Sequence, residues 1–174
     1  MEFLSLQSTR GYRSGFGRAV FAVCLLLLAS PSLAQQPAEG PFAALPGTWT
    51  GTGTIAMSGG AKERIRCRAT YRLGSSTDLR LEMSCTSDNY KFELQSHITY
   101  SDRALSGSWN ETTRGVGGTV TGSATGTQIR ARAEGQTFTA ILAMNTRGSR
   151  QSVSIQSPGS EMSNITIELA RGSR

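Results

Sequence analysis

The sequence has few of the side chains that enzymes use for nucleophilic or metal chemistry. Its 174 residues include one histidine and three cysteines. His97 falls on a polar position of an alternating segment, so we expect it to face solvent rather than to act as a general base. The sequence shows no recognisable Ser–His–acid arrangement and no recognisable cluster of metal ligands. We therefore expect no catalytic residue, no metal, no cofactor and no enzymatic activity.

Long hydrophobic runs are also scarce. One apolar run, residues 19–29, follows three arginines and leads to the small residues Ser32 and Ala34. This pattern is typical of a secretory signal peptide cleaved after Ala34, with a signal anchor as the alternative. The run is shorter than the ~20 residues that span a bilayer. The sequence thus predicts a periplasmic or secreted protein. Its expected parts are a signal peptide (1–34), a flexible lead-in (35–44), a β domain (45–170) and a C-terminal tail (171–174).

Convincing helical periodicity is absent as well. From residue 45 onward, short segments alternate apolar and polar residues and are separated by Gly, Ser, Asn and Asp, which favours an all-β fold. About ten strands with short connections leave no room for crossover helices, so the strands should be antiparallel. We expect a single up-and-down β-barrel, with a two-sheet sandwich as the alternative. Glu134-Gly135 is the expected tight turn between two of its later strands.

Cysteine is rare but informative. Cys67 and Cys85 remain beyond the expected leader, and two cysteines in an exported chain most simply form a disulfide. If segments 63–73 and 79–85 form a hairpin in which the two cysteines lie opposite each other, only one register is possible. A slip by one residue would turn arginines into the core. The register pairs apolar residues at three further positions: Ala69 with Met83, Tyr71 with Leu81, and Leu73 with Leu79.

The other face of this hairpin is rich in arginine. It carries the residues that we call the arginine face: Arg64, Arg66, Arg68, Arg72 and Arg80. Such a surface suits an anionic envelope component, such as a lipid headgroup, a lipopolysaccharide phosphate or an acidic polymer. The alternative is a solvated strand face, neutralised in part by Glu63 and Glu82. Nucleic acid is not expected, because no exposed aromatic residues interleave with the arginines. A fully charged strand face also argues against an integral membrane barrel.

Alternation points large side chains inward from several strands. They are Trp49, Tyr71, Phe92, Tyr100, Trp109, Phe138 and Met144. Small barrels line ligand cavities with such residues, whereas a filled core is the alternative reading. Because many of their inward neighbours are Gly or Ala, we expect space for a small apolar or amphipathic ligand.

The run Gly47-Thr48-Trp49 opens the first expected strand. It resembles the G-x-W signature of the calycin superfamily, the lipocalin-like barrels, and the opening of avidin-like barrels. Segment 45–170 also resembles a group of small exported bacterial proteins of unassigned function, through this Trp, Ile65-Arg66-Cys67-Arg68 and Tyr71. The resemblance implies a barrel and suggests a ligand, but other lipocalin loops are missing, and Arg171 is the candidate to stack on Trp49.

In outline the chain is also similar to periplasmic lysozyme inhibitors, although no matching inhibitory loop is present. This similarity implies a second hypothesis, an envelope interaction or inhibitor protein that acts through the arginine face.

Glycines along the first strand, including Gly51, should let it bend strongly and let other backbone approach closely.

Overall fold

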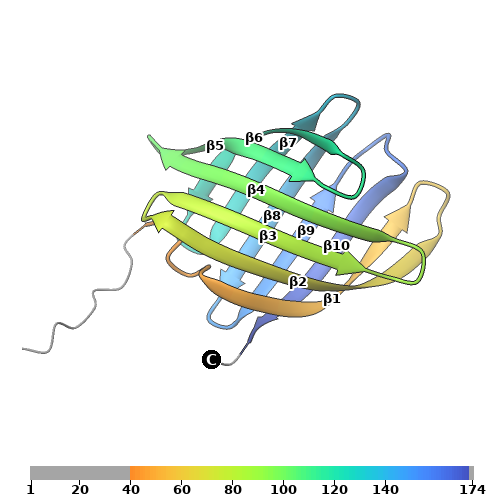
Figure 1. The fold of residues 1–174 in the computed structure, drawn as a ribbon, viewed down its shortest axis with the longest axis horizontal. Helices are drawn as coiled ribbons and strands as arrows, with labels where there is room; N and C mark the ends of the chain where they lie inside the picture. The colour runs from red at the N-terminus through yellow and green to blue at the C-terminus, as the bar shows by residue number, and fades with distance from the viewer. Residues whose placement is uncertain (1–39, 173–174) are drawn as a thin grey trace, which may run out of the picture. The chain divides into compact units, whose positions relative to one another are not determined.

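A computed structural model describes residues 40–172 of the chain, and the expected signal peptide (1–34) lies outside this range. The described part contains ten β-strands (Figure 1). Their bounds are β1 (Gly47–Met57), β2 (Lys62–Ser75), β3 (Asp78–Thr86), β4 (Lys91–Ser101), β5 (Ala104–Glu111), β6 (Val116–Thr125), β7 (Gln128–Gly135), β8 (Thr139–Arg147), β9 (Arg150–Gln156) and β10 (Met162–Arg171). Within residues 40–172, no helix has the length and apolar character needed to cross a membrane.

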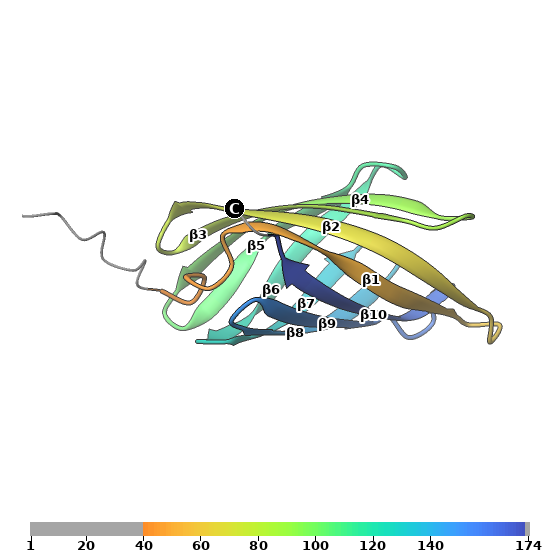
Figure 2. The ribbon, with the colours of Figure 1, turned by 90° about the horizontal axis from the view of Figure 1, so that it is seen from below.

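The strands form a closed antiparallel barrel. Each strand pairs with the next in the chain, and β1 also pairs with β10, so that the sheet returns on itself (Figures 1 and 2). This closure confirms the predicted up-and-down barrel and rules out the two-sheet sandwich. It also provides a hydrogen-bonding neighbour on both sides of every strand, which removes the exposed edges that promote aggregation.

The β2–β3 hairpin has the predicted register. Cys67 lies opposite Cys85 and is bonded to it through a disulfide. The three apolar pairs expected from this register are all present. In β2 the inward residues from Ile65 to Tyr71 are buried, while the arginines between them are exposed. The disulfide spans a sequence separation of 18 residues, a loop whose closure contributes about 3 kcal/mol in the chain-entropy description.

One turn differs from the prediction. Glu134 and Gly135 lie within β7, where Gly135 pairs with Gly118 of β6. The chain reverses after them, and the Gly135 N–H donates to the Phe138 carbonyl at 3.0 Å. A Cβ at position 135 would lie 3.2 Å from the Trp109 ring. This glycine therefore provides room for the tryptophan rather than a left-handed turn.

Residues 40–46, which include the described part of the lead-in, cover one end of the barrel, which we call the closed end. Phe42 and Trp49 are fully buried there. The Trp49 indole N–H donates to the Leu45 carbonyl at 2.8 Å. The Arg171 guanidinium stacks on the Trp49 ring, 4.5 Å from its centroid, and donates to the Pro46 carbonyl at 2.9 Å. The candidate stacking partner named from sequence is thus in place, and it ties the last strand to the first.

Candidate functional site

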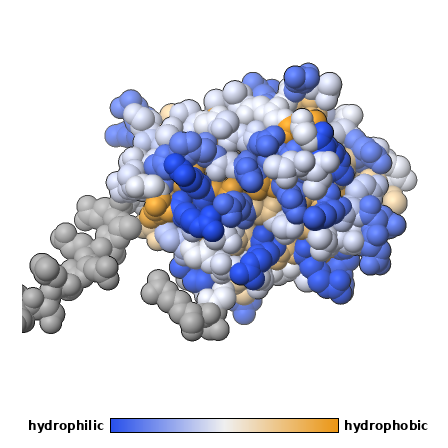
Figure 3. Space-filling model, in the orientation of Figure 1, coloured by the Kyte–Doolittle hydropathy of each residue, from blue (hydrophilic) through white to orange (hydrophobic). Residues whose placement is uncertain are grey.

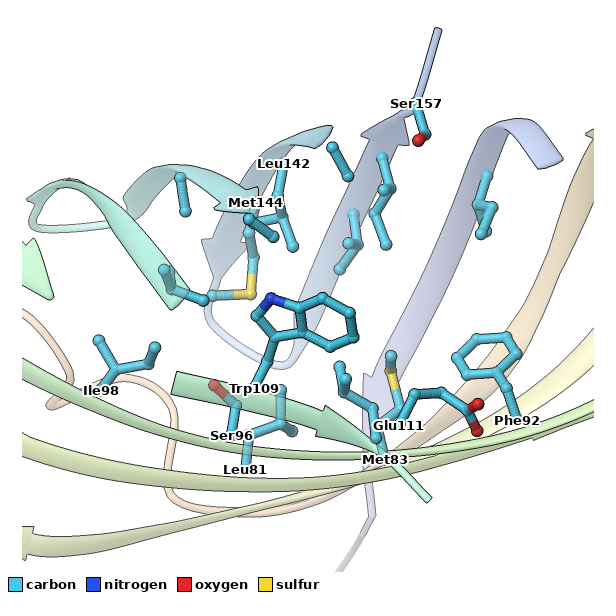
Figure 4. Close-up of a pocket in the computed structure, with 18 of the residues that line it drawn as sticks. Leu81, Met83, Phe92, Ser96, Ile98, Trp109, Glu111, Leu142, Met144 and Ser157 are labelled. Carbon is cyan, nitrogen blue, oxygen red and sulfur yellow. The ribbon is translucent and has the colours of Figure 1, made fainter. Parts of the chain in front are cut away.

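A cavity of about 340 Å³ lies inside the barrel, bounded by side chains from strands on opposite walls (Figure 4). Its walls are largely apolar. Leu81, Met83 and Ile98 lie on one side in Figure 4, and Leu142 and Met144 lie on the other. The volume falls at the lower end of the ~300–1,000 Å³ typical of small-molecule pockets. The interior is therefore not a completely filled core.

Five of the seven predicted interior residues line the cavity. They are Tyr71, Phe92, Trp109, Phe138 and Met144. Trp49 is buried but belongs to the closed end, below the cavity. Tyr100 packs its ring edge-on against Phe42, with the centroids 6.4 Å apart, and it also lies outside the lining. Trp49 and Tyr100 form the floor of the cavity at the closed end, because they contact the segment that precedes β1. The alternation of apolar and polar residues could not predict that this segment packs there.

The opposite end of the barrel forms the mouth of the cavity. The lining there includes Arg114 of the β5–β6 connection, Phe138 of the β7–β8 connection, and Ser157 and Glu161 of the β9–β10 connection. Successive antiparallel strands place alternate connections at the same end. The mouth is thus formed by loops, whereas the closed end is sealed by the packed lead-in.

Glu111 is a buried carboxylate that the sequence reasoning missed. It is 8% exposed, at the end of β5 and in the cavity lining. Its oxygens accept hydrogen bonds from the backbone N–H groups of Glu93 (3.0 Å), Thr113 (3.0 Å) and Arg114 (2.9 Å), and from the Thr113 hydroxyl. Burial acts to raise the pKa of Glu111, but these hydrogen bonds outweigh it and lower the pKa to about 2. Glu111 is thus an ionised group that orders the rim.

A second buried polar group connects Tyr71 to strands on the other side of the barrel. The Tyr71 hydroxyl donates to Gln151 Oε1 at 2.8 Å, and Gln151 Nε2 donates to Thr146 Oγ1 at 3.0 Å. Burial raises the pKa of Tyr71 above its usual range, and the bond to Gln151 only partly opposes this. The phenol therefore remains a neutral donor, and it is fully engaged in holding the barrel together.

The arginine face lies on the outside of β2 and β3. All five of its arginines are exposed, and strongly hydrophilic residues gather over this side of the barrel (Figure 3). Arg72 pairs with Glu82 at 2.7 Å. Arg64, Arg66, Arg68 and Arg80 have no ion-pair partner among residues 40–172. This surface is separate from the cavity, since its side chains point away from the interior.

Titratable groups do not converge on a reactive arrangement. His97 is on the outer face of β4, where its side chain is half exposed and contacts Asp78. Across the described part of the chain, no three His, Cys, Asp or Glu residues are close enough to hold a metal ion. What the interior offers is an enclosed apolar space with a few polar groups, an arrangement suited to binding.

Solved structures share this fold. The chain is similar to Rv2717c from M. tuberculosis, with a TM-score of 0.63 and 12% identity over 79% of this chain and 99% of that one. It is also similar to the S-type phycobiliprotein lyase CPES from Guillardia theta, with a TM-score of 0.51 and 11% identity over 76% and 91% of the two chains. At such identities the likeness concerns the fold alone, and it confirms the calycin/lipocalin-like barrel. No family model and no curated protein matches the chain.

Proposed function

We propose that the protein is an exported binding protein that holds a small apolar or amphipathic ligand inside its barrel. The observation that carries this proposal is the apolar cavity of about 340 Å³ within a closed sheet. Burying apolar ligand surface in such a space releases about 25 cal/mol per Å². Export is supported by the sequence pattern of residues 1–34 and by the disulfide, which forms in oxidising compartments.

Titration with a neutral apolar fluorophore, N-phenylnaphthylamine, tests the proposal directly. The purified protein should enhance and blue-shift the dye emission with saturable, one-to-one binding. Ala131→Phe adds a large ring to the cavity lining, so it should weaken binding by at least about tenfold. Ala143→Phe makes the same change on the exposed face of the neighbouring strand and should leave the affinity unchanged.

Two further results separate this proposal from a function of the arginine face. Reversing the charge of Arg66 and Arg68, which lie outside the cavity, should leave dye binding intact. Loss of binding in that variant, with the fold preserved by circular dichroism, would argue for the outer surface instead. Absence of saturable dye binding by the native protein would refute the cavity proposal itself.

A further inference from the structure

The indole N–H of Trp109 is a buried donor that the fold leaves without an acceptor. Trp109 is 8% exposed and lines the cavity. Its Nε1 is inaccessible to solvent and has no hydrogen-bond partner within residues 40–172. Buried polar side-chain atoms are nearly always paired, so an exception in a ligand-sized cavity needs a physical account.

The ring is held in a position from which the N–H cannot turn elsewhere. Phe138 packs against it with the ring centroids 5.4 Å apart. Gly135 passes so close that a Cβ there would lie 3.2 Å from the indole. Figure 4 shows the nitrogen edge facing across the cavity toward Met144 and Leu142, whose side chains contain no oxygen or nitrogen acceptor. The donor therefore points at the Met144 side chain on the cavity wall, a flexible thioether that an incoming acceptor displaces to reach the nitrogen.

The serine hydroxyls of the lining already have partners. Ser96 lies directly across from Trp109, yet its hydroxyl donates to the Ser108 carbonyl at 2.8 Å. The Ser157 hydroxyl donates to the Thr139 carbonyl at 3.0 Å. As described above, Tyr71 and Glu111 are also satisfied. Within the described lining, the Trp109 N–H is thus the single buried donor left to be met.

From this arrangement we infer that the ligand is a neutral molecule with an apolar body and one hydrogen-bond acceptor, of the carbonyl type, which receives the Trp109 N–H. An acceptor is required because the indole nitrogen can only donate. The inference rests on the proposed function and names the chemical class of the ligand for that same site.

The neutral class follows from the electrostatics of β5. Glu111 lies two residues beyond Trp109 on the same face of the strand, and its carboxylate is ionised. Arg114 also lines the cavity at the mouth, but its guanidinium is already paired with Glu111 at 3.5 Å. A ligand carboxylate beside Trp109 would thus have one donor to replace its hydration and a like charge nearby, a costly arrangement in an apolar interior. A ketone, aldehyde or ester oxygen needs only the one donor that is present.

Three probes with the same bicyclic body distinguish the possibilities. They are tetralin, which has no polar group, tetralone, which adds a ketone, and tetrahydronaphthoate, which adds a carboxylate. Each is titrated against the protein preloaded with N-phenylnaphthylamine. The inference predicts that tetralone displaces the dye best once each affinity is corrected for the probe's partition between water and hydrocarbon, and that the carboxylate is the weakest.

Variants assign the preference to one nitrogen. Trp109→Phe keeps an aromatic ring but removes the donor, and it should reduce the preference for tetralone over tetralin by about tenfold. Trp49→Phe is the matched control. It removes the other indole, whose N–H is already bonded to Leu45 at the closed end, and should leave the preference unchanged.

The indole N–H resonances give a readout on the native protein, which contains two tryptophans. Tetralone should shift the Trp109 resonance downfield, while tetralin should not, and the Trp49 resonance should barely move. If tetralin and tetralone both bind with no difference in preference and no such shift, the inference is overturned while the binding function stands. Tightest binding by the carboxylate overturns it in the same way. If neither the dye nor any probe binds, the proposed function itself fails.

Discussion

Trp109 and Glu111 are two positions apart on β5 and point into the same interior, yet they differ in how their polar atoms are satisfied. Each Glu111 oxygen accepts hydrogen bonds from the rim, whereas the Trp109 donor has no partner within residues 40–172. The carboxylate therefore has a structural role in ordering the mouth, and the indole is available to a ligand. Two residues of the same strand thus have different roles: Glu111 stabilises the mouth of the cavity, and Trp109 offers a hydrogen bond to a ligand.

Glu111 should make the stability of the barrel depend on pH. Its folded-state pKa of about 2 lies below the ordinary value of 4.5, so its stabilising effect is present above pH 4.5 and is lost as the pH falls toward 2. The loss amounts to a few kcal/mol, since one pKa unit corresponds to about 1.4 kcal/mol. Urea unfolding across this range should show a shallower pH dependence for Glu111→Gln, together with lower stability at neutral pH.

Glu134→Gln is the control for this prediction. The Glu134 side chain is half exposed and pairs with Arg132 at the surface, where an ion pair contributes at most about 1 kcal/mol. Its removal should leave the pH profile close to that of the native protein. Parallel profiles for the native protein and Glu111→Gln would show that the carboxylate does not stabilise the rim in this way.

The sequence can place Glu111 inside the barrel but cannot show what it does there. Its position follows the same alternation as Leu105, Gly107 and Trp109, so the signal for burial was present. Its hydrogen-bond donors come from Glu93 on the neighbouring strand and from the turn that follows. That convergence depends on register and turn geometry together, which alternation along one strand does not specify.

At the scale of elements, the turn of the β4–β5 hairpin contains local backbone strain. Asp102 and Arg103 form the two-residue loop and have φ values of 51° and 67°. Two positive φ values are typical of a type I′ turn, which suits the twist of a hairpin. Aspartate tolerates this conformation through its short polar side chain, whereas arginine gains nothing from it.

Arg103→Gly should therefore stabilise the protein. Glycine adopts the left-handed conformation freely, and the substitution should add about 1 kcal/mol to the free energy of unfolding. Thermal unfolding by circular dichroism measures this as a rise of a few degrees in Tm. Arg147→Gly, which places glycine in strand β8 instead, should lower Tm. An equal response of the two variants would contradict the explanation by turn strain.

Registers within hairpins were predictable where two independent constraints agreed. In β2–β3 the cysteine pair and the apolar alternation select the same alignment, and the structure has it. The β7–β8 turn lacked such a second constraint. Glu134-Gly135 matches a common turn sequence, but Gly135 is needed inside the strand because Trp109 and Phe138 crowd that position. Here packing from a distant strand overrides a local turn preference.

At the scale of the whole molecule, closure depends on a close approach between the first and last strands. Gly51 on β1 pairs with Leu169 on β10, and a Cβ at Gly51 would lie only 1.9 Å from the Glu168 carbonyl oxygen. The obstacle is backbone, so it cannot move aside as a flexible side chain would. The glycines at the start of the domain are thus required by the close pairing of β1 with β10, which we call the barrel seam.

Gly51→Ala should destabilise the barrel by more than about 3 kcal/mol, in the range expected when a buried site must shift its backbone. Chemical unfolding at equilibrium measures the loss. Gly59→Ala is the control, because that glycine has open space around it and no positive φ. If Gly51→Ala unfolds at the same denaturant concentration as the native protein, the seam tolerates a side chain there.

The barrel and the presence of interior space were predictable from the sequence, but the size and shape of the cavity were not. Alternation determines which side chains point inward. The empty space depends on how closely they pack across the barrel. Trp109 and Phe138 pack against one another rather than across the interior, and the lead-in withdraws Tyr100 to the floor. These contacts join residues far apart in the sequence, and together they leave the cavity that the proposed ligand occupies.

The seam between β1 and β10 also has a kinetic consequence. Because β1 pairs with β10, the sheet cannot close until nearly the whole chain is available. Barrels whose ends must meet fold slowly, since the ordering of a long intervening chain precedes the final contacts. A polypeptide that emerges with its N-terminal strand first would therefore remain open and accessible to chaperones until its C-terminal segment arrives.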